Sequence, residues 1–171
     1  MKKLLLPFFL LGTVAMMFVM AKTGASLKTT ATPHGILDLE FAYNTAKTAG
    51  IMQAWAPTAE LDNIAAARIN TYWDFLFLFF YAGFLFLACK RIAAKTGAGF
   101  SKAGHIVAKG AVAAGFLDIL ENSGMLLTLS GQGSSAIAFC TTIVALVKWV
   151  LAIMGVLYVL IGVLALGFRK R

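Results

Sequence analysis

The stretch GFLDILENSGMLL, residues 115–127, places polar side chains inside an otherwise apolar run. Asp118, Glu121 and Asn122 follow the i, i+3, i+4 spacing that puts side chains on one face of a helix. Carboxyl groups in apolar surroundings pair with a cation, hold a proton or mark a binding site. Lys148, in the next apolar run, is the cation within reach. The sequence therefore predicts a buried polar site built from two helices.

The predicted site holds more acidic than basic groups. A lone charge at the centre of a bilayer costs at least about 2.5–3.5 kcal/mol, so pairing is strongly favoured. Two carboxyl groups share one ammonium, and the cheapest arrangement keeps one of them protonated. We expect Asp118 to pair with Lys148. We expect Glu121, beside Asn122 and nearer the end of its helix, to be the neutral group.

Composition places these residues in a membrane protein. The chain has 171 residues, of which 60% are hydrophobic and only 13% are charged, and its mean hydropathy is +0.85. A soluble domain has about 25% charged residues. The net charge of +8 comes from short basic clusters beside apolar runs. That placement is typical of membrane topology, and it argues against nucleic-acid binding.

The apolar runs predict one all-α membrane domain, a bundle of four transmembrane helices. A helix needs about 20 apolar residues to cross a bilayer. The predicted spans are residues 4–21, 71–89, 107–129 and 136–168. The last run is longer than a bilayer requires, so it must tilt, project from the membrane, or bend near Gly155 or Gly162.

The first run also has features of a signal peptide. It follows basic residues and contains Val19 and Ala21 as a candidate cleavage site. The apolar core of a signal peptide has about 7–15 residues, and the run at 4–21 is longer. Its length favours a retained transmembrane helix.

Basic residues predict the orientation. Ten of them fall on one side of the spans with no acid among them: Lys2, Lys3, Lys90, Arg91, Lys95, Lys102, Lys109, Arg169, Lys170 and Arg171. The other side balances Lys22, Lys28, Lys47 and Arg68 against Asp38, Glu40, Glu60 and Asp62. Loops rich in Lys and Arg stay in the cytoplasm. We expect both termini and the loop 90–106 to be cytoplasmic, and the segment 22–70 to be outside.

The outer segment is expected to contain amphipathic helices lying on the membrane surface. Five apolar side chains fall near one helical face: Leu37, Phe41, Ile51, Met52 and Trp55. Trp55 is expected at the level of the lipid headgroups. Thr58, after Pro57, is expected to cap the helix that continues into the second span.

Three acid and imidazole side chains near the start of this segment suggest a weak alternative. His34, Asp38 and Glu40 lie close together in sequence, but a solvated acidic turn explains them better than a metal site. His105 is predicted on the opposite side of the membrane from His34, so the two do not form a shared metal or haem site. We predict no metal, no cofactor and no catalytic residue.

Depth along the helices extends the polar site to the second span. The short connection SGQGSSA at 130–136 makes the third and fourth spans antiparallel neighbours, which sets Lys148 level with Asp118. Asp74 and Tyr81 share one face of the second span. The predicted binding seam consists of Asp74, Tyr81, Asp118, Glu121, Asn122, Thr141 and Lys148.

Several short motifs carry a family resemblance. They are GILDLEFA at 35–42, Trp55, YWDFLFLFFYA at 72–82, LDILEN at 117–122 and LVKW at 146–149. In this order they resemble a group of small bacterial four-span integral membrane proteins with no assigned activity. The resemblance implies a location in the bacterial inner membrane and implies no reaction.

Three functions are compatible with the predicted seam, and the seam also serves as structural glue between helices. The leading hypothesis is binding of a lipid, a small amphiphile or an ion, with coupling to protons as an option. The second is a non-catalytic accessory or assembly subunit, whose partner is another membrane protein or a second copy. The third, less favoured, is an enzyme that uses Asp118 or Glu121 on a lipid or a peptide bond. A cavity opening from the seam favours the first hypothesis, and a closed seam favours the second.

Overall fold

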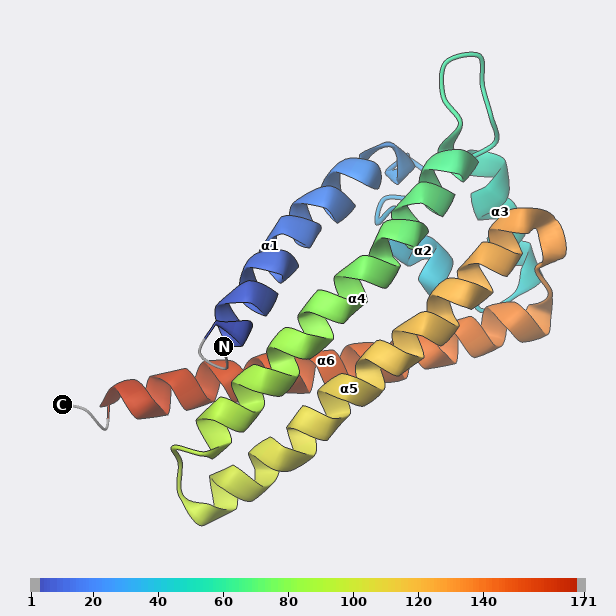
Figure 1. The fold of residues 1–171 in the computed structure, drawn as a ribbon. Coiled ribbons are helices and arrows are strands. Elements are labelled where there is room, and N and C mark those ends of the chain that lie inside the picture. Colours follow the sequence, from blue (N-terminus) through green and yellow to red (C-terminus); the bar gives the residue numbers. More distant parts are fainter. Residues whose placement is uncertain (1–3, 169–171) are drawn as a thin grey trace.

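Four long helices make up most of residues 4–168, the part of the chain that the computed structural model describes (Figure 1). They are α1 (Leu5–Thr23), α4 (Asn63–Ala93), α5 (Ala98–Leu127) and α6 (Ser135–Phe168). Each is long and apolar enough to cross a membrane. No strand occurs among the described residues. The predicted all-α fold with four transmembrane helices is confirmed. Five of the basic residues on which the predicted membrane orientation depends lie outside the described residues. They are Lys2, Lys3, Arg169, Lys170 and Arg171.

Helices α4, α5 and α6 pack on one another, and α1 packs along α4 (Figure 1). The contact between α1 and α4 is reciprocal. The Phe80 ring of α4 lies against Gly12 of α1, and the Phe9 ring of α1 lies against Gly83 of α4. A methyl group at either glycine would overlap the facing ring. Glycine at these two positions therefore sets how closely α1 approaches.

The segment between α1 and α4 folds into a cap over one end of the bundle. It contains a short 3₁₀ helix (Ala25–Leu27), α2 (Ile36–Glu40) and α3 (Thr45–Ala54). Trp55 is fully buried in it, and its indole N–H donates to Leu27 O at 3.0 Å and to Thr32 Oγ1 at 3.1 Å. Trp55 is therefore buried inside the cap and is not exposed on the surface of an amphipathic helix. The cap supplies acceptors for the indole N–H, so the whole ring can be buried.

Helix boundaries differ from the sequence-based prediction in two places. Helix α4 begins at Asn63, and Asp62 caps it by accepting from Ala65 N at 2.9 Å. Thr58 instead closes a separate turn with Leu61. The segment 90–106, expected as a loop, is helical except for residues 94–97.

Helix α6 runs without interruption for 34 residues, or about 51 Å. Gly155 and Gly162, expected as candidate bends, lie against Leu85 and Ile92 of α4. Their small size serves packing between the two helices.

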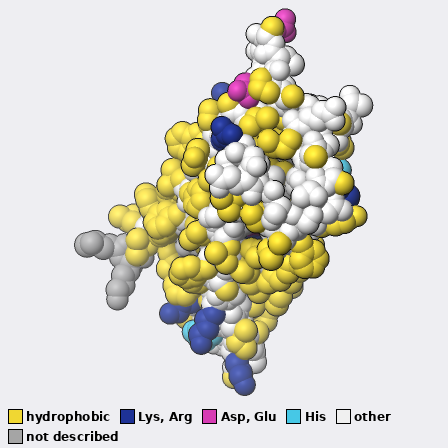
Figure 2. All heavy atoms as spheres, turned by 90° about the vertical axis from the view of Figure 1, so that its right-hand side faces the viewer, with side chains coloured by type: hydrophobic (Ala, Val, Ile, Leu, Met, Phe, Trp, Pro, Cys, Tyr) yellow, Lys and Arg dark blue, Asp and Glu magenta, His cyan; other side chains and the backbone are white. Residues whose placement is uncertain are grey.

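Hydrophobic side chains cover the middle of the bundle on the face drawn in Figure 2. Lys and Arg side chains gather on that face at the end where α4 meets α5, and acidic side chains lie at the capped end. An apolar belt between two polar ends is the surface that a bilayer requires of a spanning protein.

Candidate functional site

Lys148 is the centre of the polar cluster. It is only 6% exposed, and its Nζ lies 2.8 Å from Glu121 Oε1 and 3.1 Å from Asp118 Oδ1. The Oε2 atom of Glu40 lies 3.7 Å away. The predicted contact of Lys148 with Asp118 is present, because the short turn after α5 sets α6 antiparallel to it. Glu121, expected to be the neutral acid, lies even closer to the ammonium group. One ammonium thus faces three carboxyl groups.

Helix α4 joins the cluster through two side chains seven residues apart. The Tyr81 hydroxyl donates to Asp118 Oδ2 at 2.7 Å. Asp74 is buried, and its Oδ2 accepts from Asn122 Nδ2 at 2.9 Å. Six of the seven predicted seam residues are therefore brought together by α4, α5 and α6.

Thr141 is the exception. It packs against Gly124 and makes no hydrogen bond to the cluster in the described part of the chain. Seven residues separate it from Lys148, a rise of about 10.5 Å, and its short hydroxyl cannot span that distance. The adjacent Thr142 instead donates to the backbone oxygen of Glu40 at 3.0 Å. Thr141 therefore has a packing role between α5 and α6.

Glu40 belongs to the cluster and was missed by the sequence argument. It is 5% exposed, and its Oε2 also accepts from Trp149 Nε1 at 3.1 Å. The expected solvated acidic turn is therefore wrong for Glu40, although Asp38 is partly exposed. Residues two apart on a helix point about 200° apart, so α2 presents the two acids to opposite sides. The sequence contained one indication that Glu40 is buried. The apolar Ile36 lies four residues before it, on the same face of the helix.

A cavity of about 450 Å³ opens from this cluster. It lies between α1, α4 and α6, with α2 at its capped end. Its polar end is lined by Glu40, Asn70, Asp74, Tyr81, Asp118 and Lys148, whereas Glu121 and Asn122 lie behind that wall. Its remaining walls are mainly apolar and include Met17, Phe77, Phe84, Trp149 and Val156. One space therefore joins a buried polar end to an apolar channel.

The mouth of the cavity faces sideways, between α1 and α6. Its rim includes Met17 at 57%, Trp149 at 39% and Val156 at 46% exposure. These side chains project from helices that are apolar enough to cross a membrane. The mouth therefore opens where lipid chains would surround a spanning bundle.

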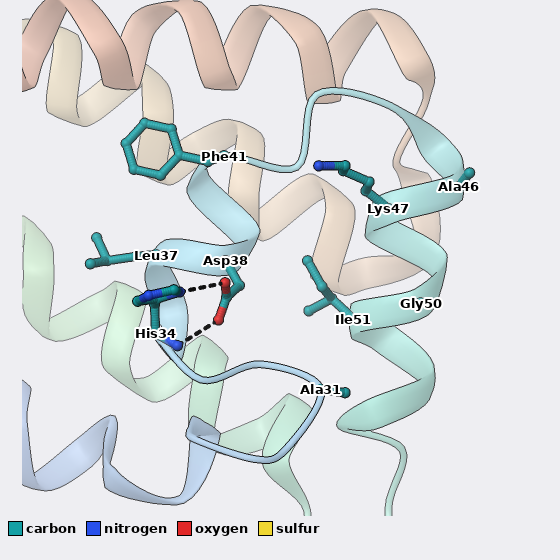
Figure 3. Close-up of a pocket in the computed structure, with 9 residues that line it drawn as sticks. All are labelled: Ala31, His34, Leu37, Asp38, Phe41, Ala46, Lys47, Gly50 and Ile51. Atoms are coloured by element: carbon teal, nitrogen blue, oxygen red, sulfur yellow. Dashed lines mark hydrogen bonds and ion pairs between the residues drawn. The ribbon is translucent and has the colours of Figure 1, made fainter.

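A second hollow of about 500 Å³ lies in the cap between α2 and α3 (Figure 3). Leu37, Phe41 and Ile51 form apolar parts of its wall. At its edge, Asp38 accepts from His34 N at 2.8 Å and lies 3.2 Å from the His34 ring. Because both oxygens of this acid are already in contact, the hollow is a weaker ligand site than the inner cavity.

No group of three or more His, Cys, Asp or Glu side chains able to hold a metal occurs in residues 4–168. Comparison with protein-family models, curated proteins and solved structures finds no match to this chain. The function has to be inferred from the cluster and the cavity themselves.

Proposed function

We propose that this chain is a multi-pass protein of the bacterial cytoplasmic membrane that binds a lipid or another small amphiphile. The apolar part of the ligand occupies the channel between α1 and α6, and its polar end meets the cluster around Lys148. The observation that carries this proposal is the continuity of an exposed apolar mouth with a buried polar end in one cavity.

The distribution of basic residues supports the orientation of the protein in that membrane. The α4–α5 end carries Lys90, Arg91, Lys95, Lys102 and Lys109, and residues 90–109 contain no acid. The positive-inside rule assigns this end to the cytoplasm. Four crossings then put both termini in the cytoplasm and the cap outside. The motif resemblance to small bacterial four-span proteins supports a bacterial inner membrane.

The size and lining of the cavity favour an amphiphile over the other hypotheses. Sites for small molecules have volumes of about 300–1,000 Å³ and mostly apolar walls, which this cavity matches. A bare ion needs neither the volume nor the apolar channel. A cluster that only joined helices, or an accessory subunit with a closed seam, would need no cavity.

Purification tests the proposal. The protein is extracted in a mild detergent, and bound molecules are identified by native mass spectrometry and by chromatography of an organic extract. Val156→Trp fills the mouth, whereas Val150→Trp changes a similarly exposed valine of α6 that does not line the cavity. We expect a bound amphiphile with the wild type and Val150→Trp, and its loss with Val156→Trp. Equal retention by both variants, or no bound molecule in any sample, contradicts the proposal.

A further inference from the structure

The donors at the polar end of the cavity are already occupied. Lys148 Nζ faces three carboxyl groups, the Tyr81 hydroxyl donates to Asp118, and Trp149 Nε1 donates to Glu40. These contacts leave no free side-chain donor among the charged and aromatic groups of the cluster that line the cavity. A ligand at this end therefore has to supply donors of its own.

Asn70 provides an acceptor that nothing in the described chain satisfies. It is 1% exposed and lines the cavity. Its Nδ2 donates to Met20 O at 3.0 Å and to Thr23 Oγ1 at 2.7 Å. Because a backbone oxygen only accepts, this contact fixes which end of the amide is nitrogen. The Oδ1 atom is left buried with no hydrogen-bond partner in residues 4–168.

Asp74 lies one helical turn beyond Asn70 and also lines the cavity. Its Oδ2 atom accepts from Asn122, and this hydrogen bond does not involve its other oxygen. Side chains four residues apart on a helix have Cβ atoms about 5–6 Å apart. The two side chains therefore lie one helical turn apart in the wall of the same cavity, which is the spacing that one small group with several N–H donors needs in order to contact both.

The charge of the cluster selects the sign of such a group. Three carboxyl groups, those of Glu40, Asp118 and Glu121, lie around Lys148, which is the one basic side chain of the cluster in residues 4–168. Asp74 adds a fourth carboxyl group, which contacts Asn122. A cationic group would lower the repulsion among the acids. A phosphate or carboxylate headgroup would add to it.

These observations deepen the proposed function and depend on it. We propose that the bound amphiphile carries a primary ammonium group, which donates to Asn70 Oδ1 and to the Asp74 carboxylate. An ammonium has three donors and no acceptor, which matches a polar end made of acceptors. Its apolar chain follows Phe77, Phe84 and Val156 toward the mouth.

The test uses full-length protein in nanodiscs of uncharged lipid and a series of probes with the same chain. The probes are dodecylamine, dodecyltrimethylammonium, dodecanol and dodecanoate, with methylamine as the headgroup without a chain. Binding is measured by native mass spectrometry and by the shift in unfolding temperature. We expect dodecylamine to bind at least about tenfold more tightly than each of the others.

Variants locate the headgroup. Asp74→Asn removes a charge while its amide oxygen still accepts from Asn122, and it should weaken dodecylamine binding about tenfold. Asp38→Asn, which removes a partly exposed acid of the cap that does not line the cavity, should leave binding unchanged. Both variants are checked for wild-type helix content and unfolding temperature. If Asp74→Asn does not fold, the probe series on the wild type still tests the proposal.

The outcomes separate the two proposals. If dodecanol or dodecanoate binds as tightly as dodecylamine and Val156→Trp blocks it, the amphiphile site stands and the ammonium proposal is wrong. If dodecyltrimethylammonium binds as tightly as dodecylamine, the site recognises only the positive charge, and the proposed hydrogen bond to Asn70 is wrong. If methylamine binds as tightly as dodecylamine, or no dodecyl probe binds, the proposed amphiphile site itself is wrong.

Discussion

At the scale of single residues, the cluster depends on one cation. Lys148 contacts Asp118, Glu121 and Glu40, and none of these acids has another basic side chain within ion-pair distance among the described residues. Removing one partner of a buried ion pair is far more costly than removing both, because the remaining charge stays desolvated. Lys148 is therefore the most sensitive position of the cluster.

We predict that Lys148→Met lowers the free energy of unfolding by about 3–5 kcal/mol. Unfolding in mixed micelles, followed by circular dichroism, measures the change. Lys109→Met on the exposed surface of α5 is the control and should have little effect. Adding Glu121→Met or Asp118→Met to Lys148→Met should recover much of the loss. Strict additivity in both double variants would show that these groups are not coupled.

The second residue-scale prediction concerns the neutral carboxyl group. Both oxygens of Asp118 accept a hydrogen bond, one from Lys148 and one from Tyr81. Glu121 accepts from Lys148 through Oε1, but its Oε2 is buried with no partner in residues 4–168. We expect Glu121 to be the protonated acid. Glu121→Gln should keep the fold and abolish the protonated-carboxyl band in infrared difference spectra between pH 5 and pH 9. A band that persists in Glu121→Gln, and disappears in Asp118→Asn instead, would reverse the assignment.

The pairing of Lys148 could be predicted because it depends only on helical spacing and on depth along two neighbouring helices. Glu40 could not be predicted in the same way. Its helix is five residues long, and the side it buries is decided by how the cap docks on α6. Asn70 could have been predicted as part of the polar site by the same reasoning as Asp74, since the two residues are one helical turn apart. Thr141 shares the face of Lys148, but spacing alone does not show that a glycine meets it.

At the scale of elements, α1 is the wall that completes the cavity. It contributes Met17 and Met20 to the lining and is held mainly by its contact with α4. Phe9 and Phe80 each fill the space above a glycine of the facing helix. Asn70 of α4 adds a second attachment near the capped end, where its Nδ2 donates to Met20 O and Thr23 Oγ1 of α1.

We predict that Gly83→Val displaces α1, because its side chain would overlap the Phe9 ring. Overpacking of this kind costs about 1–3 kcal/mol. Cross-linking between cysteines at Thr23 and Asn70, in a chain lacking Cys89 and Cys140, reports the position of α1. Cross-link yield should fall with Gly83→Val and should be unchanged with Gly99→Val, where an added Cβ meets nothing within 4 Å. Equal yields would mean that α1 is held by other contacts.

The helices could be predicted from the sequence more reliably than their boundaries. Long apolar runs predicted the four helices, because a bilayer permits little else. The start of α4 was predicted too early, because Thr58 and Asp62 are both good capping residues. Thr58 is used in the turn with Leu61, so Asp62 caps the helix. The burial of Trp55 could not be predicted, because an indole suits a membrane interface and a buried hydrogen-bonded site equally well.

At the scale of the whole molecule, basic residues at the α4–α5 end predict the topology. We expect Lys95→Cys to be labelled only from the cytoplasm and Lys28→Cys only from outside, in a chain lacking Cys89 and Cys140. Both lysines are exposed, so a membrane-impermeant maleimide reaches them from the correct side. Labelling of both positions from the same side would refute the topology.

The sideways mouth between α1 and α6 determines where the proposed ligand comes from. An amphiphile that enters there is drawn from a two-dimensional reservoir, the plane of the bilayer, and its chain never needs to pass through water. Occupancy then follows the mole fraction of the amphiphile among the surrounding lipids. Adding buffer leaves that fraction nearly unchanged, whereas fusing the membrane with inert lipid dilutes it and empties the site.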